Sequence, residues 1–186
     1  VVEDTVTSVR MRLRNGPWVE RGEGQPLVLM TQRLRLDAFL AEQAVAAGAE
    51  LRDGAKVTAV EETPAGIEVT AGGERVRAEA LVGADGVNGV CARTLGLGAN
   101  QAVGVALEGN VPWEKLDGGY RGCAVLELGL VPGGYGWVFP KGDHANLGVG
   151  GWMEEGPRLR DHLERLARAH GVDPSELTEV RGHRLP

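Results

Sequence analysis

Most of the chain consists of short runs that are either wholly apolar or alternate between apolar and polar residues, and glycine or proline separates them. They occupy residues 5–14, 27–30, 55–62, 66–71, 74–79, 101–111, 122–130, 134–140 and 145–151. A period of two puts every second side chain on one face of a strand, so the pattern predicts many short β-strands. Glycine supplies 29 of the 186 residues, which provides the tight turns that such strands need.

Only two segments follow the 3.6-residue period of an amphipathic helix, residues 36–47 and residues 157–170. Gly48 stands where a glycine ends many helices, and Gly171 ends the second segment. These two helices among many strands predict an α/β (α+β mixed) chain.

The order of the runs predicts two parts. The three runs within 55–79 predict an antiparallel meander, and the four runs after residue 100 predict one antiparallel sheet. Between them, the apolar run 80–84 predicts a buried strand, with a short helix following at roughly 88–95. We therefore expect one part over 1–100 and a second over 101–186, with the boundary near 98–102.

Composition excludes several classes of protein. The net charge is −6 without a basic stripe, which argues against a nucleic-acid partner. No run approaches the roughly 18 apolar residues of a membrane-spanning helix. No signal peptide is recognisable. Cys91 and Cys123 fit no metal spacing, which predicts no metal site and favours a reducing compartment.

Two short stretches have the residue types of a nucleotide site. In Gly83-Ala84-Asp85-Gly86 a carboxylate follows an apolar strand, where it can accept from a ribose hydroxyl or, alternatively, cap a turn. Arg33 stands four residues before Asp37 at a helix start, where it can bind a phosphate or remain solvated, and Arg35 competes with it for this role.

A third stretch concentrates aromatic residues. Alternation puts Tyr135, Trp137 and Phe139 on one face of a strand, and Gly148 and Gly150 share a face of the next. If the two strands pair, small residues lie opposite large rings, which leaves a groove for an apolar ligand. The alternative is an ordinary packed core.

Other polar residues are interpreted as structural. Alternating Arg10, Arg12 and Arg14 predict a solvated strand face. We expect solvated or capping roles for all four histidines and solvation for two residues of the turn after the aromatic motif, and we name no catalytic acid. These residues are His144, His162, His170 and His183, with Lys141 and Asp143.

Together these motifs, in this order, resemble the geranylgeranyl reductase family of FAD-dependent oxidoreductases. The family's aromatic motif, Tyr/Phe-x-Trp-x-Phe-Pro, then seven or eight residues, then Gly-x-Gly, is matched without a mismatch by Tyr135 to Gly150. The resemblance runs from about residue 27 to 186. It implies the middle segment of a glutathione-reductase-type FAD/NAD(P)-binding fold with an antiparallel substrate-domain sheet.

The resemblance also implies roles for individual residues. The cofactor FAD would meet Arg33 at its ribose and diphosphate, the backbone of Val57 at its adenine, and Asp85 and Gly86 along the dinucleotide. The isoprenoid pocket would be shaped by Tyr135, Trp137, Phe139, Pro140, Gly148 and Gly150. One departure is Gly89, where the family commonly has serine. The glycine-rich turn that holds the pyrophosphate and the later Gly-Asp motif are absent, so we expect this segment alone to bind FAD weakly or not at all.

The implied reaction transfers a hydride from reduced FAD to a carbon–carbon double bond of a geranylgeranyl or polyprenyl chain. The implied partners are an isoprenoid or prenyl-quinone substrate and an external electron donor, NAD(P)H or ferredoxin. We expect a cytoplasmic protein; a lipid substrate is compatible with peripheral membrane contact, although no amphipathic segment has a basic face. A flavin-dependent aromatic monooxygenase or halogenase and a non-catalytic lipid-binding module stay open as alternatives.

Overall fold

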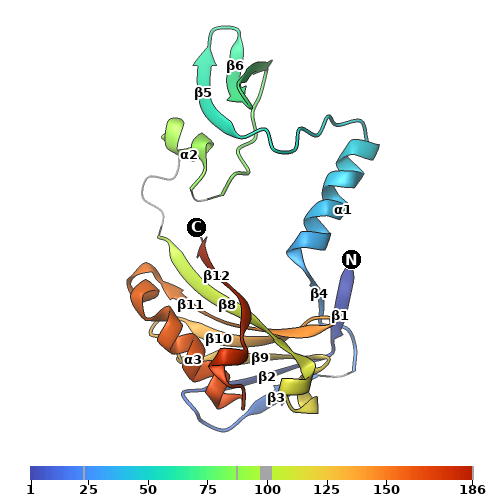
Figure 1. Ribbon diagram of the computed structural model, residues 1–186, viewed down its shortest axis with the longest axis vertical. Helices are drawn as coiled ribbons and strands as arrows, with labels where there is room; N and C mark the ends of the chain where they lie inside the picture. The colour runs from blue at the N-terminus through green and yellow to red at the C-terminus, as the bar shows by residue number, and fades with distance from the viewer. Residues whose placement is uncertain (23, 87, 97–101, 186) are drawn as a thin grey trace. The chain divides into compact units, whose positions relative to one another are not determined.

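A computed structural model describes residues 1–22, 24–86, 88–96 and 102–185 (Figure 1). The chain divides into two compact units, one made of residues 1–42 and 103–185 and the other of residues 43–102. The first unit contains a seven-stranded sheet and a two-stranded sheet, and the second contains a three-stranded sheet.

The seven-stranded sheet has the strand order β12-β8-β11-β10-β9-β2-β3. Neighbouring strands are antiparallel, except that β2 runs parallel to β9. The antiparallel sheet predicted after residue 100 is therefore confirmed, and three further strands extend it. The strands are β2 (Ser8–Leu13), β3 (Val19–Arg21), β8 (Gly104–Pro112), β9 (Cys123–Leu128), β10 (Tyr135–Pro140), β11 (His144–Trp152) and β12 (Thr178–Leu185).

Helix α3 (Leu159–Ala169) covers one face of this sheet and buries the main core there (Figure 1). Leu163 and Leu166 are almost fully buried against the valines and leucines of β9, β10 and β11. A methyl group at Gly136 of β10 would lie 3.1 Å from Leu166, so Gly136 faces the helix. Its neighbour Trp137 therefore faces the opposite side of the sheet.

The predicted single strand over residues 5–14 is wrong, because the chain changes sheets at Thr7. β1 (Val2–Val6) pairs with β4 (Val28–Thr31), whereas β2 joins the large sheet. The backbone amides of Thr7 and Ser8 both donate to the Gly122 carbonyl, at 2.8 and 3.2 Å. This contact satisfies the backbone where neither ladder continues.

In the second unit, β5 (Val57–Thr63), β6 (Gly66–Ala71) and β7 (Glu74–Ala78) form the predicted antiparallel meander. The predicted helix at roughly 88–95 is present as α2 (Val90–Thr94), which packs on β5. The strand predicted over 80–84 is not formed, and Val82 is 87% exposed. An apolar run becomes a strand only beside a partner strand, and none pairs with it in the described part of the chain.

The first predicted helix is α1 (Arg33–Ala46), and Gly48 beyond its end has a φ of +100°, the left-handed geometry expected of a helix terminus. None of the residues of α1 is buried. The boundary between the two compact units falls inside α1, and residues 1–31 build their sheets in the unit that contains 103–185. The predicted division of function at residue 100 remains a prediction, and most of the expected boundary lies outside the described residues.

Candidate functional site

The aromatic motif lies on the sheet face that α3 does not cover. Strands β10 and β11 pair so that Trp137 is opposite Gly148 and Tyr135 is opposite Gly150, as the sequence predicted. The ring of Trp137 stacks on Phe139 with centroids 5.9 Å apart, and Tyr135 lies 5.9 Å away on its other side. A methyl group at Gly148 would overlap the indole of Trp137, so only glycine leaves room for the ring there.

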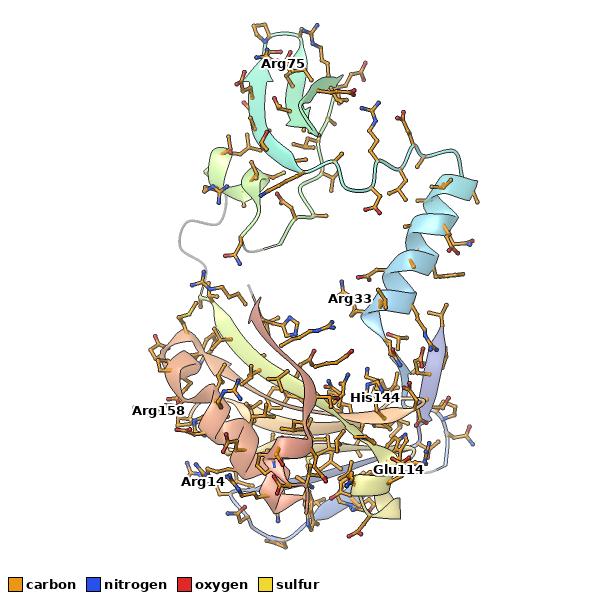
Figure 2. All side chains as sticks on the ribbon, viewed as in Figure 1. Arg14, Arg33, Arg75, Glu114, His144 and Arg158 are labelled. Atoms are coloured by element: carbon orange, nitrogen blue, oxygen red, sulfur yellow. The ribbon has the colours of Figure 1, made fainter. Side chains whose placement is uncertain are left out.

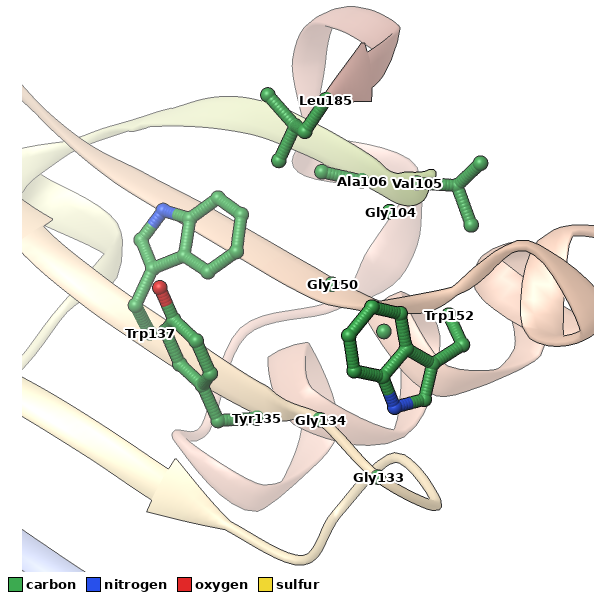
Figure 3. A pocket seen from close by; sticks show the side chains of 11 residues that line it. Gly104, Val105, Ala106, Gly133, Gly134, Tyr135, Trp137, Gly150, Trp152 and Leu185 are labelled. Carbon is green, nitrogen blue, oxygen red and sulfur yellow. The ribbon is translucent and has the colours of Figure 1, made fainter. Parts of the chain in front are cut away.

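A cavity of about 250 Å³ lies beside these rings and has a largely apolar lining (Figure 3). Tyr135 and Trp137 lie on one side of it and Trp152 on the other, with Gly150 between them. Ala106 and Leu185 close a further side. The groove expected between rings and glycines is therefore present. Phe139, Pro140 and Gly148 are not part of its lining; Phe139 packs instead on a small core around Val6.

Sequence reasoning missed several residues that line this cavity. Trp152 follows Gly150 by two positions in β11, so the alternation already used for Gly148 and Gly150 could have found it. Gly133 and Gly134 directly precede the motif. Ala106 and Leu185 enter through the pairing of β8 with β11 and β12, which no local pattern reveals.

In the second unit, Asp85 caps α2. Its Oδ2 accepts the backbone amides of Val90 at 2.6 Å and Cys91 at 3.1 Å. The hydrogen bond from the Cys91 amide outweighs the opposing effect of desolvation and lowers the pKa of Asp85 below 3.8, so the group is a carboxylate at neutral pH. A carboxylate has about four acceptor positions, which leaves capacity for a further donor such as a ribose hydroxyl. The capping alternative is thus realised, and it is compatible with the cofactor role that the sequence suggested.

Two glycines shape the Asp85 turn. Gly86 has a φ of +73° and nothing within 4 Å of the position that a Cβ would occupy. That turn therefore favours glycine and leaves space for close approach of a ligand to the backbone. At Gly89 a Cβ would collide with the Asp85 carboxylate. The departure from the family serine at this position thus allows Asp85 to reach the helix amides.

The other predicted cofactor residues lie in both units. Val57 begins β5 in the unit that contains Asp85 and Gly86, and is partly buried. Arg33 belongs to the first unit, at the start of α1 (Figure 2), with its side chain 82% exposed. It makes an i,i+4 ion pair with Asp37 at 3.0 Å, and the hydrogen bonds that it donates to that carboxylate raise its pKa. Its guanidinium is a permanent cation that stays accessible to an anionic ligand.

The arginine face expected in the first strand is not simply solvated. Arg12 donates to both oxygens of buried Glu127 at 2.8 Å and lies over the ring of Trp18. His170 is the C-cap residue of α3, as the capping alternative expected, and its ring is buried rather than solvated, with Nε2 3.0 Å from Glu127. Burial by itself would raise the pKa of Glu127, but contacts with His170 and Arg12 outweigh it and lower the pKa below 4.5.

Two further expectations of solvation are wrong. His162 is only 7% exposed, with Nε2 3.2 Å from the carboxylate of Glu155. Lys141 donates to the Thr31 carbonyl at 2.6 Å, and burial lowers its pKa below 10.5. Both residues join segments within the first unit, and neither lines the aromatic cavity.

The sequence pattern of the FAD binding domain family matches residues 4–117, which is more than half of the chain. The chain belongs to this family. Its cofactor is FAD, and Gly86 and the Asp85 carboxylate fit such a group because they offer open backbone and acceptor capacity.

Among curated relatives, the chloroplastic geranylgeranyl diphosphate reductase of Oryza sativa subsp. japonica is 31% identical over 177 residues. The match covers 84% of this chain and 38% of the rice protein. This chain spans about two-fifths of the length of the first curated relatives that it matches. The resemblance to geranylgeranyl reductases is confirmed.

Solved structures show the same fold. A geranylgeranyl bacteriochlorophyll reductase-like protein from Thermoplasma acidophilum superposes with a TM-score of 0.83 at 23% identity, covering 98% of this chain and 50% of its own. A flavin-dependent brominase, Bmp2, gives 0.72 at 16% identity, covering 98% and 52%. The expected α/β fold of FAD-binding reductases and monooxygenases is confirmed.

Metal-binding clusters and membrane-spanning helices are both absent from the described residues. No group of three or more His, Cys, Asp and Glu is placed to hold a metal ion within 1–22, 24–86, 88–96 and 102–185. No helix in the described part of the chain is long and apolar enough to cross a membrane.

Proposed function

We propose that this chain is part of a flavin-dependent reductase that saturates a carbon–carbon double bond of a geranylgeranyl or polyprenyl chain. The observation that carries the proposal is the apolar cavity beside Tyr135 and Trp137, at the motif that the geranylgeranyl reductases share. Bound FAD in its reduced form would supply the hydride. This chain's residues would bind the alkene, orient it and exclude water around it.

The cavity suits a segment of a long apolar ligand. Its volume of about 250 Å³ is slightly below the ~300 Å³ at which small-molecule pockets begin, so it would hold part of a chain rather than all of it. An apolar row continues away from it, because Leu128 pairs with Tyr135 on one side and Leu13 on the other. Leu128 is 37% exposed, Tyr135 is 44% exposed and Leu13 is 61% exposed. A polyprenyl tail would follow this row across β9 and β2.

The cofactor roles proposed from the sequence fit the local geometry of each residue. Arg33 would pair with the diphosphate through its accessible cation, and Asp85 would accept from a ribose hydroxyl while it caps α2. Gly86 and the backbone of Val57 would line the dinucleotide. NAD(P)H or ferredoxin would reduce the cofactor, and the protein would work in the cytoplasm with peripheral contact to the lipid that holds its substrate.

An anaerobic turnover assay tests the proposal. The full-length protein that contains this chain, loaded with FAD and reduced with dithionite, is incubated with geranylgeranyl diphosphate or a menaquinone, and products are identified by mass spectrometry. We expect one H₂ gained per reduced double bond. The substrate that is saturated distinguishes an isoprenoid diphosphate from a quinone tail.

Variants tie the activity to the cavity. Gly150→Leu would fill the space between Tyr135, Trp152 and Ala106 and should abolish turnover without loss of FAD. Gly156→Ala, where a new methyl group would meet nothing within 4 Å, is the matched control. In a parallel assay with dioxygen and an aromatic substrate, halogenated or hydroxylated products would assign the monooxygenase or halogenase chemistry instead. Lipid binding without any FAD would indicate the non-catalytic module.

A further inference from the structure

A chain of hydrogen bonds starts at Trp137 and crosses four neighbouring strands. Trp137 Nε1 of β10 donates to Asn146 Oδ1 of β11 at 2.8 Å, and Asn146 Nδ2 donates to Asn110 Oδ1 of β8 at 3.0 Å. Asn110 Nδ2 then donates to Glu179 Oε2 of β12 at 3.1 Å. The order of residues follows the order of strands in the sheet.

The chemistry at the two ends determines the direction of this chain. An indole N–H can only donate, and an ionised carboxylate can only accept. Each asparagine between them therefore has one amide orientation that satisfies both neighbours, and inverting either amide would place two donors or two acceptors face to face. The hydrogen bonds thus support one another and specify a single arrangement.

This chain of bonds begins at a buried wall of the cavity. Trp137 and Asn146 are 9% and 8% exposed, so an indole N–H without its partner would have no water to replace it. The ring also lies against Gly148 and stacks on Phe139 at an interplanar angle of 23°. Among the contacts that the described residues make with the ring, the hydrogen bond to Asn146 is the directional one.

The far end of the chain depends on an irregularity in β12. The pairing of β12 with β8 shifts register between Thr178 and Arg181, and Glu179 has a φ of +50°. A bulge of this kind redirects a side chain, and here the Glu179 carboxylate meets Asn110. The hydroxyl of Thr178 also donates to the Asn110 carbonyl at 3.2 Å. The bulge therefore anchors Asn110 from two sides.

We propose that Asn146 is a positioning residue that holds the Trp137 indole in the plane that sets the width of the cavity, with Asn110 and Glu179 orienting Asn146. The effect of this positioning on substrate binding rests on the proposed function: with the ring held in place, the cavity selects a narrow isoprenoid segment. The position of the ring itself does not depend on any assigned reaction.

The test begins with a measurement that needs no turnover. Trp18, Trp113 and Trp152 are replaced by phenylalanine in the full-length protein, so that Trp137 is the tryptophan of this segment, and any outside it are replaced likewise. Acrylamide quenching then reports how accessible its ring is. Asn146→Leu, which keeps the volume and removes the acceptor, should raise the quenching constant several-fold.

A matched pair of variants at Glu179, the exposed end of the chain of hydrogen bonds, separates the effect of its bond with Asn110 from that of packing. Glu179→Gln retains an acceptor oxygen and should leave quenching unchanged, whereas Glu179→Leu should raise it in the same direction as Asn146→Leu but less. The Glu179 side chain is 59% exposed, so both variants should fold even where Asn146→Leu does not. Equal quenching in wild type and Glu179→Leu, together with no change in a folded Asn146→Leu, would overturn the proposal.

Steady-state kinetics distinguish a positioning role of Asn146 from a purely structural role, because a purely structural residue would not change KM separately from kcat. Asn146→Leu should raise KM for geranylgeranyl diphosphate several-fold with little change in kcat, because it loosens the bound chain and leaves the chemical step intact. In a Trp137→Phe background the same substitution should add nothing, since the donor is already gone. If the wild type saturates no isoprenoid, the proposed function fails, and the quenching series still decides whether Asn146 positions the ring.

Discussion

At the scale of single residues, the turn around Asp85 depends on the absence of a side chain at Gly89. The Asp85 carboxylate holds the amides of Val90 and Cys91, and a Cβ at Gly89 would occupy the space of that carboxylate. Gly89→Ser would restore the residue common in geranylgeranyl reductases, yet we expect it to weaken the cap. Hydrogen exchange at the Val90 and Cys91 amides should accelerate, as it should in Asp85→Ala. Unchanged exchange in Gly89→Ser would contradict this account of the turn.

The protonation state of Asp85 controls the same two amides. Hydrogen bonding, first from the Cys91 amide, lowers its pKa in the folded state below 3.8. A carboxyl group with a lowered pKa stabilises the fold above its unfolded pKa, and this contribution is lost as the pH falls through the folded value. Protection of the two amides should therefore persist at mildly acidic pH and disappear as the pH falls through the lowered folded-state pKa, whereas Asp85→Asn should show no such transition.

Two neighbouring glycines of β11 offer a matched comparison. Gly148→Ala would push a methyl group into the Trp137 ring and should destabilise the protein by about 1–3 kcal/mol, as overpacked cores do. At Gly150 the new methyl group would find its nearest atoms at 3.4 Å and 3.6 Å, so Gly150→Ala should leave stability nearly unchanged. Urea denaturation of both variants measures the difference. Equal stabilities would mean that the Trp137 ring is not confined by Gly148.

At the scale of elements, one ion pair joins strands that are distant in sequence. Arg12 on β2 and Glu127 on β9 are 16% and 4% exposed at their side chains, across the parallel pair of the large sheet. Arg12→Met would leave a buried carboxylate without its main cation. We expect a loss of about 3 kcal/mol, the lower end for a buried pair because Arg12 keeps some solvent contact. Denaturant unfolding of Arg12→Met, Glu127→Gln and the double variant measures the coupling.

The pH dependence of this pair has a definite sign. The folded-state pKa of Glu127 lies below 4.5 although burial alone would raise it, because contacts with His170 and Arg12 dominate. The stability that it contributes is therefore present above pH 4.5 and is lost as the pH falls through the folded pKa. The wild type should exceed Glu127→Gln in unfolding free energy at neutral pH, and the difference should shrink in acid. A difference that is constant with pH would show that Glu127 is not ionised in the fold.

Elements were predictable from the sequence where a local pattern was sufficient. The meander of β5 to β7 and helix α3 follow from periodicity and glycine turns, because their partners are neighbours along the chain. The split at Thr7 and the unformed strand over 80–84 were not predictable, since each depends on which distant backbone offers hydrogen bonds. A periodic pattern states which face a strand buries and says nothing about whether a partner strand exists.

At the scale of the whole molecule, the residues of the candidate site were also predictable where they lie close together in the sequence, and not where distant strands supply them. The aromatic cavity was foreseen because Tyr135, Trp137 and the two glycines lie on one hairpin, β10 and β11. Its remaining wall, Ala106 and Leu185, arrives from strands about 30 residues before and after that hairpin. Asn146 was not predicted for a related reason. The role of an asparagine inside an apolar strand can be inferred only when its partners on the neighbouring strands, Trp137 and Asn110, are known.

The two compact units should differ in stability. The unit that contains 103–185 buries a core of fifteen residues under α3, whereas Val60 and Cys91 are the buried apolar residues found in the described part of 43–102. Since burial of apolar surface is the main stabilising contribution, the smaller unit should open first. Native-state hydrogen exchange should give β5, β6 and β7 opening free energies a few kcal/mol below those of β8, β10 and β11. Asp85→Ala should lower the opening free energies of β5, β6 and β7 only. Arg12→Met should lower those of β8, β10 and β11 only. A single opening free energy shared by all six strands, moved equally by both variants, would mean that the chain unfolds as one cooperative body.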